Sequence, residues 1–455
     1  MPDGSLPSPA PTASRALSAA SFSWIAGWTL SATFVLLFVA IQYQPHVTRG
    51  SASVRLVDLA LLGAVLVAAL ELRHGSRRLD GSRWLWVAAC AFLAFVAAAS
   101  LYPLAFDDRY DWTTHLVTAA RYAVYALIAP AVAVLARDVR ALQRLWATVV
   151  VWAVVAGAVA LAQFVGVDIF DAWPAGIRQP SFTGIPELGA LGGAAIAIGF
   201  LGVLWPGSVP RAVWVAGLVG GTLDVVIAGG VAGQIGLVGA AVAAIALAGR
   251  RLGNTPRSFA AVVLVTVLCG VGVAALRGAD LTQYARHLGL TTQNQEASGD
   301  VETYAHRELI YYIGLRVWLD RPLLGAGWQS IHEQHVYAPF LDDAHRRYPD
   351  EPQQAFPSRE RDYGIDNAYI QTLAELGLVG LGLFLALLAI GLVLGTTRAL
   401  RAPPLRAQQA LVGVLWLLVV MGTWAGQGLG AGSAFAGLSW FALGLIAAAG
   451  TPSGA

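Results

Sequence analysis

The chain of 455 residues is 57% hydrophobic and only 12% charged, with a mean hydropathy of +0.63. This composition leaves too little charge to cover a soluble globular surface, so it excludes a soluble protein and indicates a polytopic membrane protein. The net charge of +2 does not indicate nucleic-acid binding. Cys90 and Cys269 lie in apolar runs without a close partner, which argues against a disulfide framework or a metal cluster.

Residues 1–20 are rich in Ser, Pro and Ala, lack the features of a signal peptide, and are predicted to be a disordered tail. Apolar runs near the ~20 residues that cross a bilayer core follow. They lie at 22–42, 56–72, 84–104, 113–136, 145–165, 188–206, 211–229, 231–249, 258–276, 367–395, 406–425 and 432–450. They predict an all-α polytopic fold of about twelve transmembrane helices, with helices 1–9 in residues 21–276, helices 10–12 in residues 367–450 and a tail at 451–455.

Arginine placement predicts the orientation, because cytoplasmic loops retain positive charge. Alternate short loops and the N-terminal tail carry about fifteen arginines, whereas the intervening short loops carry only Arg49, Arg55, Arg109 and Arg178. Both termini are therefore predicted to be cytoplasmic. The polar segment 277–366 follows an odd number of spans, so it is predicted to be a large external (periplasmic) loop domain containing amphipathic helices.

Within this segment, residues 306–328 have the pattern of an amphipathic helix that ends before Pro322. Arg307 and Arg316 are nine residues apart and point to opposite sides of such a helix, so only one faces a given site. Arg316 has Asp320 four residues on as an ion-pair partner. Arg307 has no acid at that spacing, which leaves it either solvated or available to bind an anionic ligand.

Asp366 and Asn367 stand at the start of the tenth span, where they fit either an ordinary helix N-cap or a site at the membrane surface. Glu375 lies about 13 Å further along that helix, inside the hydrocarbon layer. An ionisable residue there is a functional candidate, or else a carboxyl that joins helices together with Gln371.

Two more arginines are candidates. Arg121 lies roughly 12 Å inside the outer end of its span, at a depth comparable to Asp224, which fits either a buried structural pair or an anion site. Arg178 lies in an external loop before a helix start, where it contacts a lipid headgroup or a ligand.

No P-loop, HExxH or GxSxG motif occurs, and no cofactor is predicted. Several histidines crowd the external segment, with a spacing compatible with a metal site or with solvated side chains: His306, His332, His335 and His345.

With these residues in view, the chain resembles the bacterial superfamily of O-antigen ligases and O-antigen polymerases, which are multi-spanning membrane glycosyltransferases. The resemblance covers mostly residues 178–382. It rests on three blocks, namely Arg178 with SFTG, the helix of Arg307 followed by Pro322, Gly325 and Gly327, and Asp366-Asn367 followed by Tyr369, Gln371, Glu375 and Gly377.

The resemblance implies an inner-membrane enzyme that transfers a glycan from an undecaprenyl diphosphate donor to a glycan or lipid acceptor at the periplasmic face, without metal. Arg178 and Arg307 are implied to hold the diphosphate and Asp366 to accept the proton of the acceptor hydroxyl. The lipid tail is expected between helices near Gly377 and Gly380. Further substrate-binding residues are expected to be Arg121, Arg316, Asn367, Tyr369 and Glu375.

The chain departs from the family pattern at two places. Asp366 stands where ligases commonly have histidine, which favours a polymerase. Val231 and Ala232 stand where many members have a Ser-Arg pair that helps to hold phosphate, so either Arg121 or Arg316 replaces the missing cation, or the donor binds differently, or catalysis is weak.

Two other functions remain compatible with the sequence. One is a transporter of a lipid or anionic solute, with intramembrane Arg121, Asp224 and Glu375 along its pathway. The other is a non-catalytic membrane scaffold.

Overall fold

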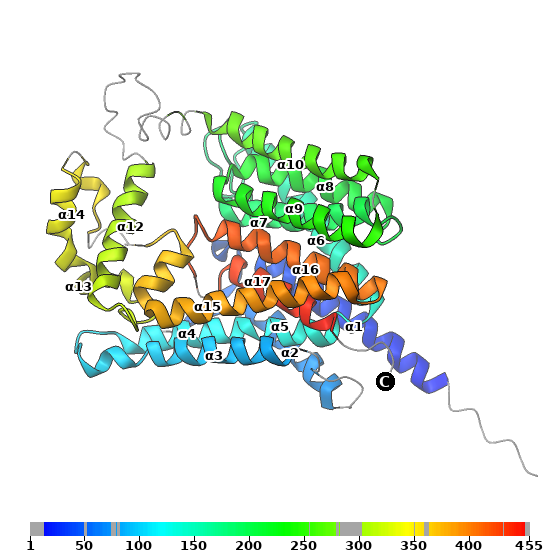
Figure 1. The fold of residues 1–455 in the computed structure, drawn as a ribbon, viewed down its shortest axis with the longest axis horizontal. Helices are drawn as coiled ribbons and strands as arrows, with labels where there is room; N and C mark the ends of the chain where they lie inside the picture. Colours follow the sequence, from blue (N-terminus) through cyan, green and yellow to red (C-terminus); the bar gives the residue numbers. More distant parts are fainter. Residues whose placement is uncertain are drawn as a thin grey trace, which may run out of the picture.

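The computed structural model describes residues 13–49, 52–73, 79, 82–253, 255–278, 282, 303–349, 351–358, 364–430 and 432–450. These residues are mostly helical (Figure 1). Their one sheet is an antiparallel hairpin of β1 (His46–Arg49) and β2 (Ala52–Arg55), in which Val47 pairs with Val54.

Each predicted apolar run coincides with a helix, or in one case with two consecutive helices. They are α1 (Ala13–Leu37), α2 (Leu56–Arg73), α3 (Arg83–Ala99), α4 (Trp112–Ala126) with α5 (Ile128–Leu135), α6 (Val139–Phe164), α7 (Ile185–Leu204), α8 (Arg211–Ala228), α9 (Val231–Leu252), α10 (Pro256–Leu276), α15 (Ala368–Arg401), α16 (Pro404–Thr423) and α17 (Ala434–Ala448). Among the described residues, 9 helical stretches are long and apolar enough to cross a membrane. The all-α polytopic class is thus confirmed.

The N-terminal boundary differs from the prediction. Helix α1 begins at Ala13, so residues 13–20 of the predicted tail are helical. The sequence ASRALSAA explains the difference, because alanine and leucine have high intrinsic helix propensity. Residues 1–12 lie outside the described part of the chain.

Helix α7 lies at the centre of the bundle and is buried along almost its whole length between α8, α9 and α16. Helices α9 and α16 cross where Gly236 meets Gly422, and a Cβ on Gly236 would lie 2.6 Å from the Val419 carbonyl oxygen. Small residues allow this close approach, which gives van der Waals packing between helices whose outer faces are apolar.

Helix α15 is interrupted at Gly377, whose φ of 64° and ψ of −166° are not helical. Residues 321–327 run beside the break and bond to it. The amides of Leu378 and Val379 donate to the carbonyls of Pro322 and Leu323, at 2.9 and 3.1 Å. In the other direction, Ala326 and Gly327 donate to the carbonyls of Ala374 and Glu375, at 2.9 and 2.8 Å. The break therefore leaves these backbone groups satisfied within the apolar layer, where water is not available.

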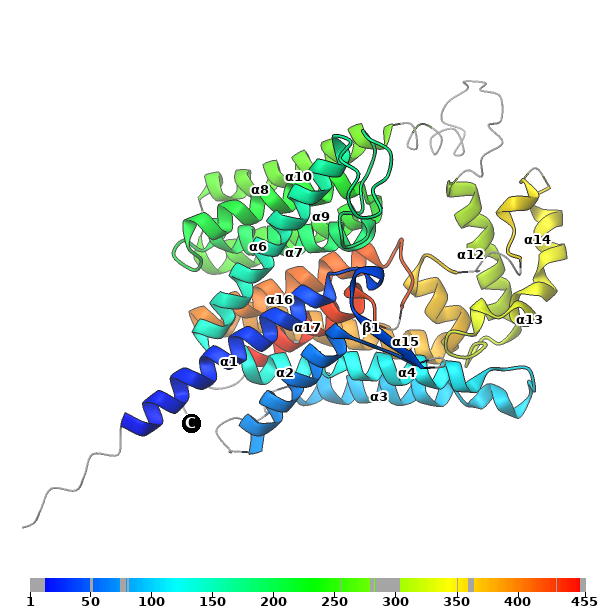
Figure 2. The ribbon, with the colours of Figure 1, turned by 180° about the vertical axis from the view of Figure 1, so that it is seen from behind.

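The described residues between α10 and α15 form a second hydrophobic core around α12 (Thr303–Asp320), α13 (Gln334–Tyr337) and α14 (Leu341–Arg347). Leu309, Ile313 and Val317 recur every four residues on one face of α12 and are buried in this core, so the predicted amphipathic helix is present. Seen from either side, these helices lie at one end of the bundle, and the start of α1 lies at the other end (Figures 1 and 2).

Candidate functional site

A cavity of about 890 Å³ lies where several helices end near α12. Its lining comes from the loop before α7, the start of α7, the α8–α9 turn, the residue after α10, the first turns of α12 and the loop after α16. This volume is within the range of small-molecule sites. The cavity therefore joins segments that are more than two hundred residues apart in the sequence.

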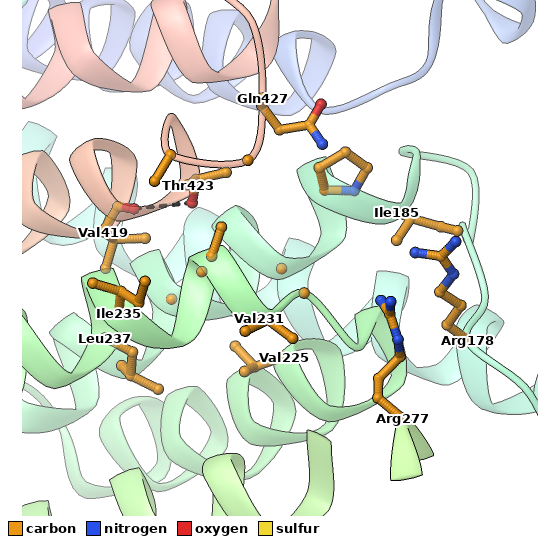
Figure 3. Close-up of a pocket in the computed structure, with 18 of the residues that line it drawn as sticks. Arg178, Ile185, Val225, Val231, Ile235, Leu237, Arg277, Val419, Thr423 and Gln427 are labelled. Atoms are coloured by element: carbon orange, nitrogen blue, oxygen red, sulfur yellow. Dashed lines mark hydrogen bonds between the residues drawn. The ribbon is translucent and has the colours of Figure 1, made fainter. Parts of the chain in front are cut away.

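Three arginines line the cavity: Arg178, Arg277 and Arg307. Figure 3 shows Arg178 and Arg277 together at one end. A Cβ on Gly229 would lie 3.5 Å from both the Arg178 Cβ and the Arg277 Cδ. Arg277 Nη1 also donates to the Gly229 carbonyl at 3.2 Å. The guanidinium of Arg307 reaches the cavity from α12, near Gly426.

The sequence predicts Arg178 and Arg307 as site residues but does not predict Arg277. Arg277 directly follows α10, at the boundary between a predicted span and the polar segment. In the orientation predicted from the arginine distribution this is the external end of the span, where an arginine runs against the usual charge bias, and this signal could have identified it. Arg277 lines the same cavity as Val231 and Ala232, where the expected Ser-Arg pair is missing.

The first turn of α9 also lines the cavity, through Gly230, Val231, Ala232 and Gly233. Gly230 is the N-cap and supplies no side-chain cap, and no acceptor among the described residues receives the first-turn amides of residues 231–233. The first N–H groups of a helix carry partial positive charge and favour an anion. The chain thus presents backbone donors close to the arginines.

The opposite end of the cavity is aliphatic, with Ile235, Leu237 and Val419 along it (Figure 3). Ile235 is 63% exposed on the outer face of α9. The apolar end therefore continues to an exposed apolar face of α9, which also carries Val238 and Val242.

Asn367, rather than Asp366, caps α15. Its side-chain oxygen accepts the amides of Tyr369 and Ile370, at 3.0 and 3.1 Å. Asp366 is exposed just before the helix, and its carboxylate bonds to no other described residue. The N-cap role that the sequence left open for Asp366 therefore belongs to Asn367.

Tyr311 connects Asp366 with the cavity. It lines the cavity one helical turn after Arg307 and donates its hydroxyl to the Asp366 carbonyl at 3.1 Å. Burial raises the pKa of Tyr311, although Arg307 partly opposes the shift. The phenol therefore stays protonated and acts as a donor. Glu308 also lines the cavity and is the acidic residue among the lining residues.

Glu375 is buried and acts as a connector between loops. Its carboxylate accepts the Gln371 side-chain amide at 3.0 Å and the Gln329 backbone amide at 3.0 Å. Gln371 in turn accepts the Leu429 amide at 2.6 Å, and Gln329 donates to the Leu429 carbonyl at 3.1 Å. This agrees with the helix-joining alternative. The network holds the loop after α16, which carries Gln427 at the cavity wall.

The other predicted substrate-binding residues lie away from the cavity lining. Arg121 donates to the Ser53 carbonyl at 2.6 Å and lies 3.4 Å from Asp58. Tyr369 donates its hydroxyl to the Met421 carbonyl at 2.7 Å. One alternative for Arg121 and the expected partner of Arg316 were wrong. Arg121 does not pair with Asp224, and Arg316 pairs with Asp343 at 3.0 Å rather than with Asp320.

Asp224 is fully buried against Gly157 of α6 and Gly192 of α7, and its carboxyl bonds to no other described residue. Arg121, Asp224 and Glu375 therefore have separate surroundings and do not line this cavity. The space near Gly377 and Gly380, where the lipid tail was expected, is filled by Leu323, Leu376 and Phe95.

The histidines between α10 and α15 have separate contacts. His306 Nδ1 lies 2.9 Å from the Ala355 carbonyl, His335 lies 2.8 Å from Asp107, and His345 stacks on Phe356. Among the described residues, no group of three or more His, Cys, Asp or Glu side chains is placed to hold a metal ion.

A family model described as O-Antigen ligase matches residues 216–385. The match begins in α8 and ends in α15, so it includes Arg277, Arg307, Asp366 and the first turn of α9. A comparison with curated proteins found no match. This segment is thus similar to the O-antigen ligase family, which supports the resemblance seen in the sequence and agrees with a multi-pass bacterial membrane protein.

Proposed function

We propose that this protein transfers a glycan from undecaprenyl diphosphate to a glycan or lipid acceptor at the external face of the bacterial inner membrane. The observation that carries the proposal is one cavity that is lined by three arginines, two of them together at one end, and by an aliphatic wall (Figure 3). A diphosphate joined to a long hydrocarbon chain has the same two-part chemistry. The family match supports a membrane glycan ligase or polymerase.

Arg178, Arg277 and Arg307 would bind the diphosphate, assisted by the first-turn amides of α9. The bond between the anomeric carbon and the diphosphate oxygen breaks in the reaction, and the leaving undecaprenyl diphosphate keeps the electron pair. Negative charge on the diphosphate therefore grows toward the transition state. Guanidinium groups stabilise that charge because each can bond two oxygens at once.

Asp366 is the proposed base. The acceptor hydroxyl attacks the anomeric carbon, a new glycosidic bond forms, and the hydroxyl proton passes to the Asp366 carboxylate. Asp366 is suited to this because Asn367 has taken the capping role and Tyr311 links its backbone to the cavity. Aspartate in place of histidine favours a polymerase over a ligase.

The polyprenyl tail would leave the cavity past Val231, Ile235 and Val419. This route replaces the one expected near Gly377 and Gly380, where protein atoms fill the space. The large exposure of Ile235 allows the tail to continue into the surrounding lipid.

The test is complementation of a deletion strain, with surface polysaccharide and lipid-linked glycans as the readout. Arg178→Ala, Arg277→Ala and Arg307→Ala should each lower transfer by at least ~100-fold, by analogy with removal of a donor that stabilises a developing oxyanion. Arg316→Ala is the matched control, because Arg316 is on the same helix as Arg307 but pairs with Asp343 outside the cavity.

Each outcome of the complementation test has a distinct meaning. Single repeat units on the lipid carrier indicate loss of a polymerase, and long lipid-linked chains that never reach an acceptor indicate loss of a ligase. Normal glycan output from the Arg307→Ala variant, present in the membrane at the wild-type level, would contradict the proposal.

A further inference from the structure

The loop before α7 places an aromatic ring against one of the three arginines. The Arg178 guanidinium carbon lies 4.8 Å from the centroid of the Trp173 ring. Both residues line the cavity, and Trp173 is 40% exposed. A guanidinium over the face of a tryptophan is attracted by the ring quadrupole. Unlike a carboxylate, the ring does not neutralise the charge of the arginine.

The backbone around this pair is fixed by Gln179, which is fully buried. Its side-chain oxygen accepts the Trp173 amide at 2.9 Å, and its side-chain nitrogen donates to the carbonyls of Trp173 and Pro174 at 3.1 and 2.9 Å. The Gln179 backbone amide donates to the Ile227 carbonyl at the end of α8, at 3.2 Å. The loop is therefore tied both to itself and to the α8–α9 turn.

A second anchor holds the other side of the loop. Gly176, with a φ of 81°, donates its amide to the Phe164 carbonyl at the end of α6, at 2.9 Å. Trp173 thus lies in a loop that is held in place by hydrogen bonds to α6 and α8. A side chain held in this way can restrict the rotamers of the long arginine beside it.

We infer that Trp173 is a positioning residue, which holds the Arg178 guanidinium at the phosphate end of the cavity. This inference rests on the proposed function, because it assigns a diphosphate as the partner of Arg178. Trp173 acts through Arg178, so its effect on donor binding exists only when the arginine is present.

The experiment measures binding of undecaprenyl diphosphate, and of uncharged undecaprenol, to the purified full-length protein in nanodiscs. Trp173→Leu should lower the affinity for the diphosphate about two- to thirty-fold, which is the range expected for a lost cation–π contact. Affinity for undecaprenol should not change. Trp173→Phe keeps an aromatic face and should retain most of the affinity.

Trp84→Leu provides a matched control. Trp84 is 67% exposed, and the guanidinium carbon of Arg83 lies 5.7 Å from its ring centroid, but neither residue lines the cavity. This variant removes a tryptophan–arginine contact elsewhere and should bind the diphosphate as the wild type does.

A double-mutant cycle separates the inference from the proposed function. In an Arg178→Ala background, Trp173→Leu should have no further effect on diphosphate binding. An equal loss in both backgrounds would overturn the positioning role, and so would unchanged affinity in Trp173→Leu while Arg178→Ala binds weakly. If Arg178→Ala, Arg277→Ala and Arg307→Ala all bind the diphosphate normally, the proposed function itself fails. Thermal unfolding of each variant identifies any that are misfolded.

Discussion

Gly377 has a backbone conformation that other residue types adopt only with strain. Its φ of 64° lies in the left-handed region, and a Cβ there would overlap the Leu323 carbonyl. We expect Gly377→Ala to destabilise the protein by more than ~2 kcal/mol, because the positive φ alone costs 1–2 kcal/mol for a residue with a Cβ. Thermal unfolding in detergent measures this effect.

Gly382 is the control for that substitution, since it lies on the same helix and a Cβ there would meet no atom within 4 Å. Gly382→Ala should be neutral or stabilising by up to ~1 kcal/mol, because alanine is the better helix former. Equal unfolding temperatures for the two variants would show that the break in α15 is not needed.

Gly230 is an N-cap without a capping side chain, although a Cβ there would meet no atom within 4 Å and its φ of −81° suits any residue. Gly230→Asp should stabilise α9 by a few tenths of a kcal/mol by capping its amides. The added carboxylate should also weaken undecaprenyl diphosphate binding at least about tenfold, because it repels the phosphates and occupies their donors.

Two controls separate charge from capping at Gly230. Gly230→Ala adds neither a charge nor a capping group and should bind the diphosphate as the wild type does. Gly230→Asn adds a capping group without charge, so its affinity should lie between those of the alanine and aspartate variants. Binding measured by isothermal titration or by fluorescence would decide the matter, and undiminished affinity in the aspartate variant would exclude the α9 amides from the phosphate site.

At the residue scale, the sequence could identify candidates but not their partners. Arg307 was singled out because it has no acid one turn away, a local property. The partner of Arg316 is Asp343 on another helix, and Arg277 is held at the cavity by its hydrogen bond to the Gly229 carbonyl. Both contacts depend on tertiary packing, which helix spacing does not encode.

At the scale of elements, charged side chains make the contact between α13 and the start of α4. Glu333 accepts from His115 at 2.7 Å and lies 3.2 Å from His335, which also lies 2.8 Å from Asp107. These side chains are mostly buried. They connect α13 with α4 and with the loop between α3 and α4.

We expect Glu333→Gln to loosen this contact, since it removes the charge between the two histidines and costs about 1–3 kcal/mol for hydrogen bonds to a charged group. Faster amide hydrogen exchange in α13 and the first turn of α4, with α17 unchanged, would report it. Asp320→Asn is the control, because Asp320 is 61% exposed and forms only a surface ion pair with Arg321. Similar exchange in both variants would contradict the prediction.

At the element scale, the spans were predictable because length and apolar character decide them. The run at 56–72 is a helix, α2, although it is not among the 9 helical stretches of the described residues that are long and apolar enough to cross a membrane. The tight turn near residue 230 is present, with Gly229 in the left-handed region that ends α8. The break within α15 was not predicted. It depends on backbone bonds to residues 321–327, some fifty residues earlier in the chain.

At the scale of the whole molecule, the site is made of helix ends. The ends of α8 and α10 and the beginnings of α7, α9 and α15 all lie near the cavity or the residues that border it. The opposite ends of α15 and α17 meet elsewhere, where Arg398 donates to the Ile446 carbonyl at 2.6 Å. A site at one end of the bundle is open to one side of the membrane only, so orientation decides which substrates reach it.

The arginine distribution predicts that this end faces the outside, and cysteine labelling tests it. Asp342 is exposed on α14, and Arg257 is exposed near the start of α10, at the other end of the bundle. In intact cells, a small membrane-impermeant maleimide should label Asp342→Cys, whereas Arg257→Cys should react only after the membrane is permeabilised. The unsubstituted chain controls for Cys90 and Cys269, which lie on apolar helices. The reverse pattern would place the cavity on the cytoplasmic side, where a periplasmic glycan transfer is impossible.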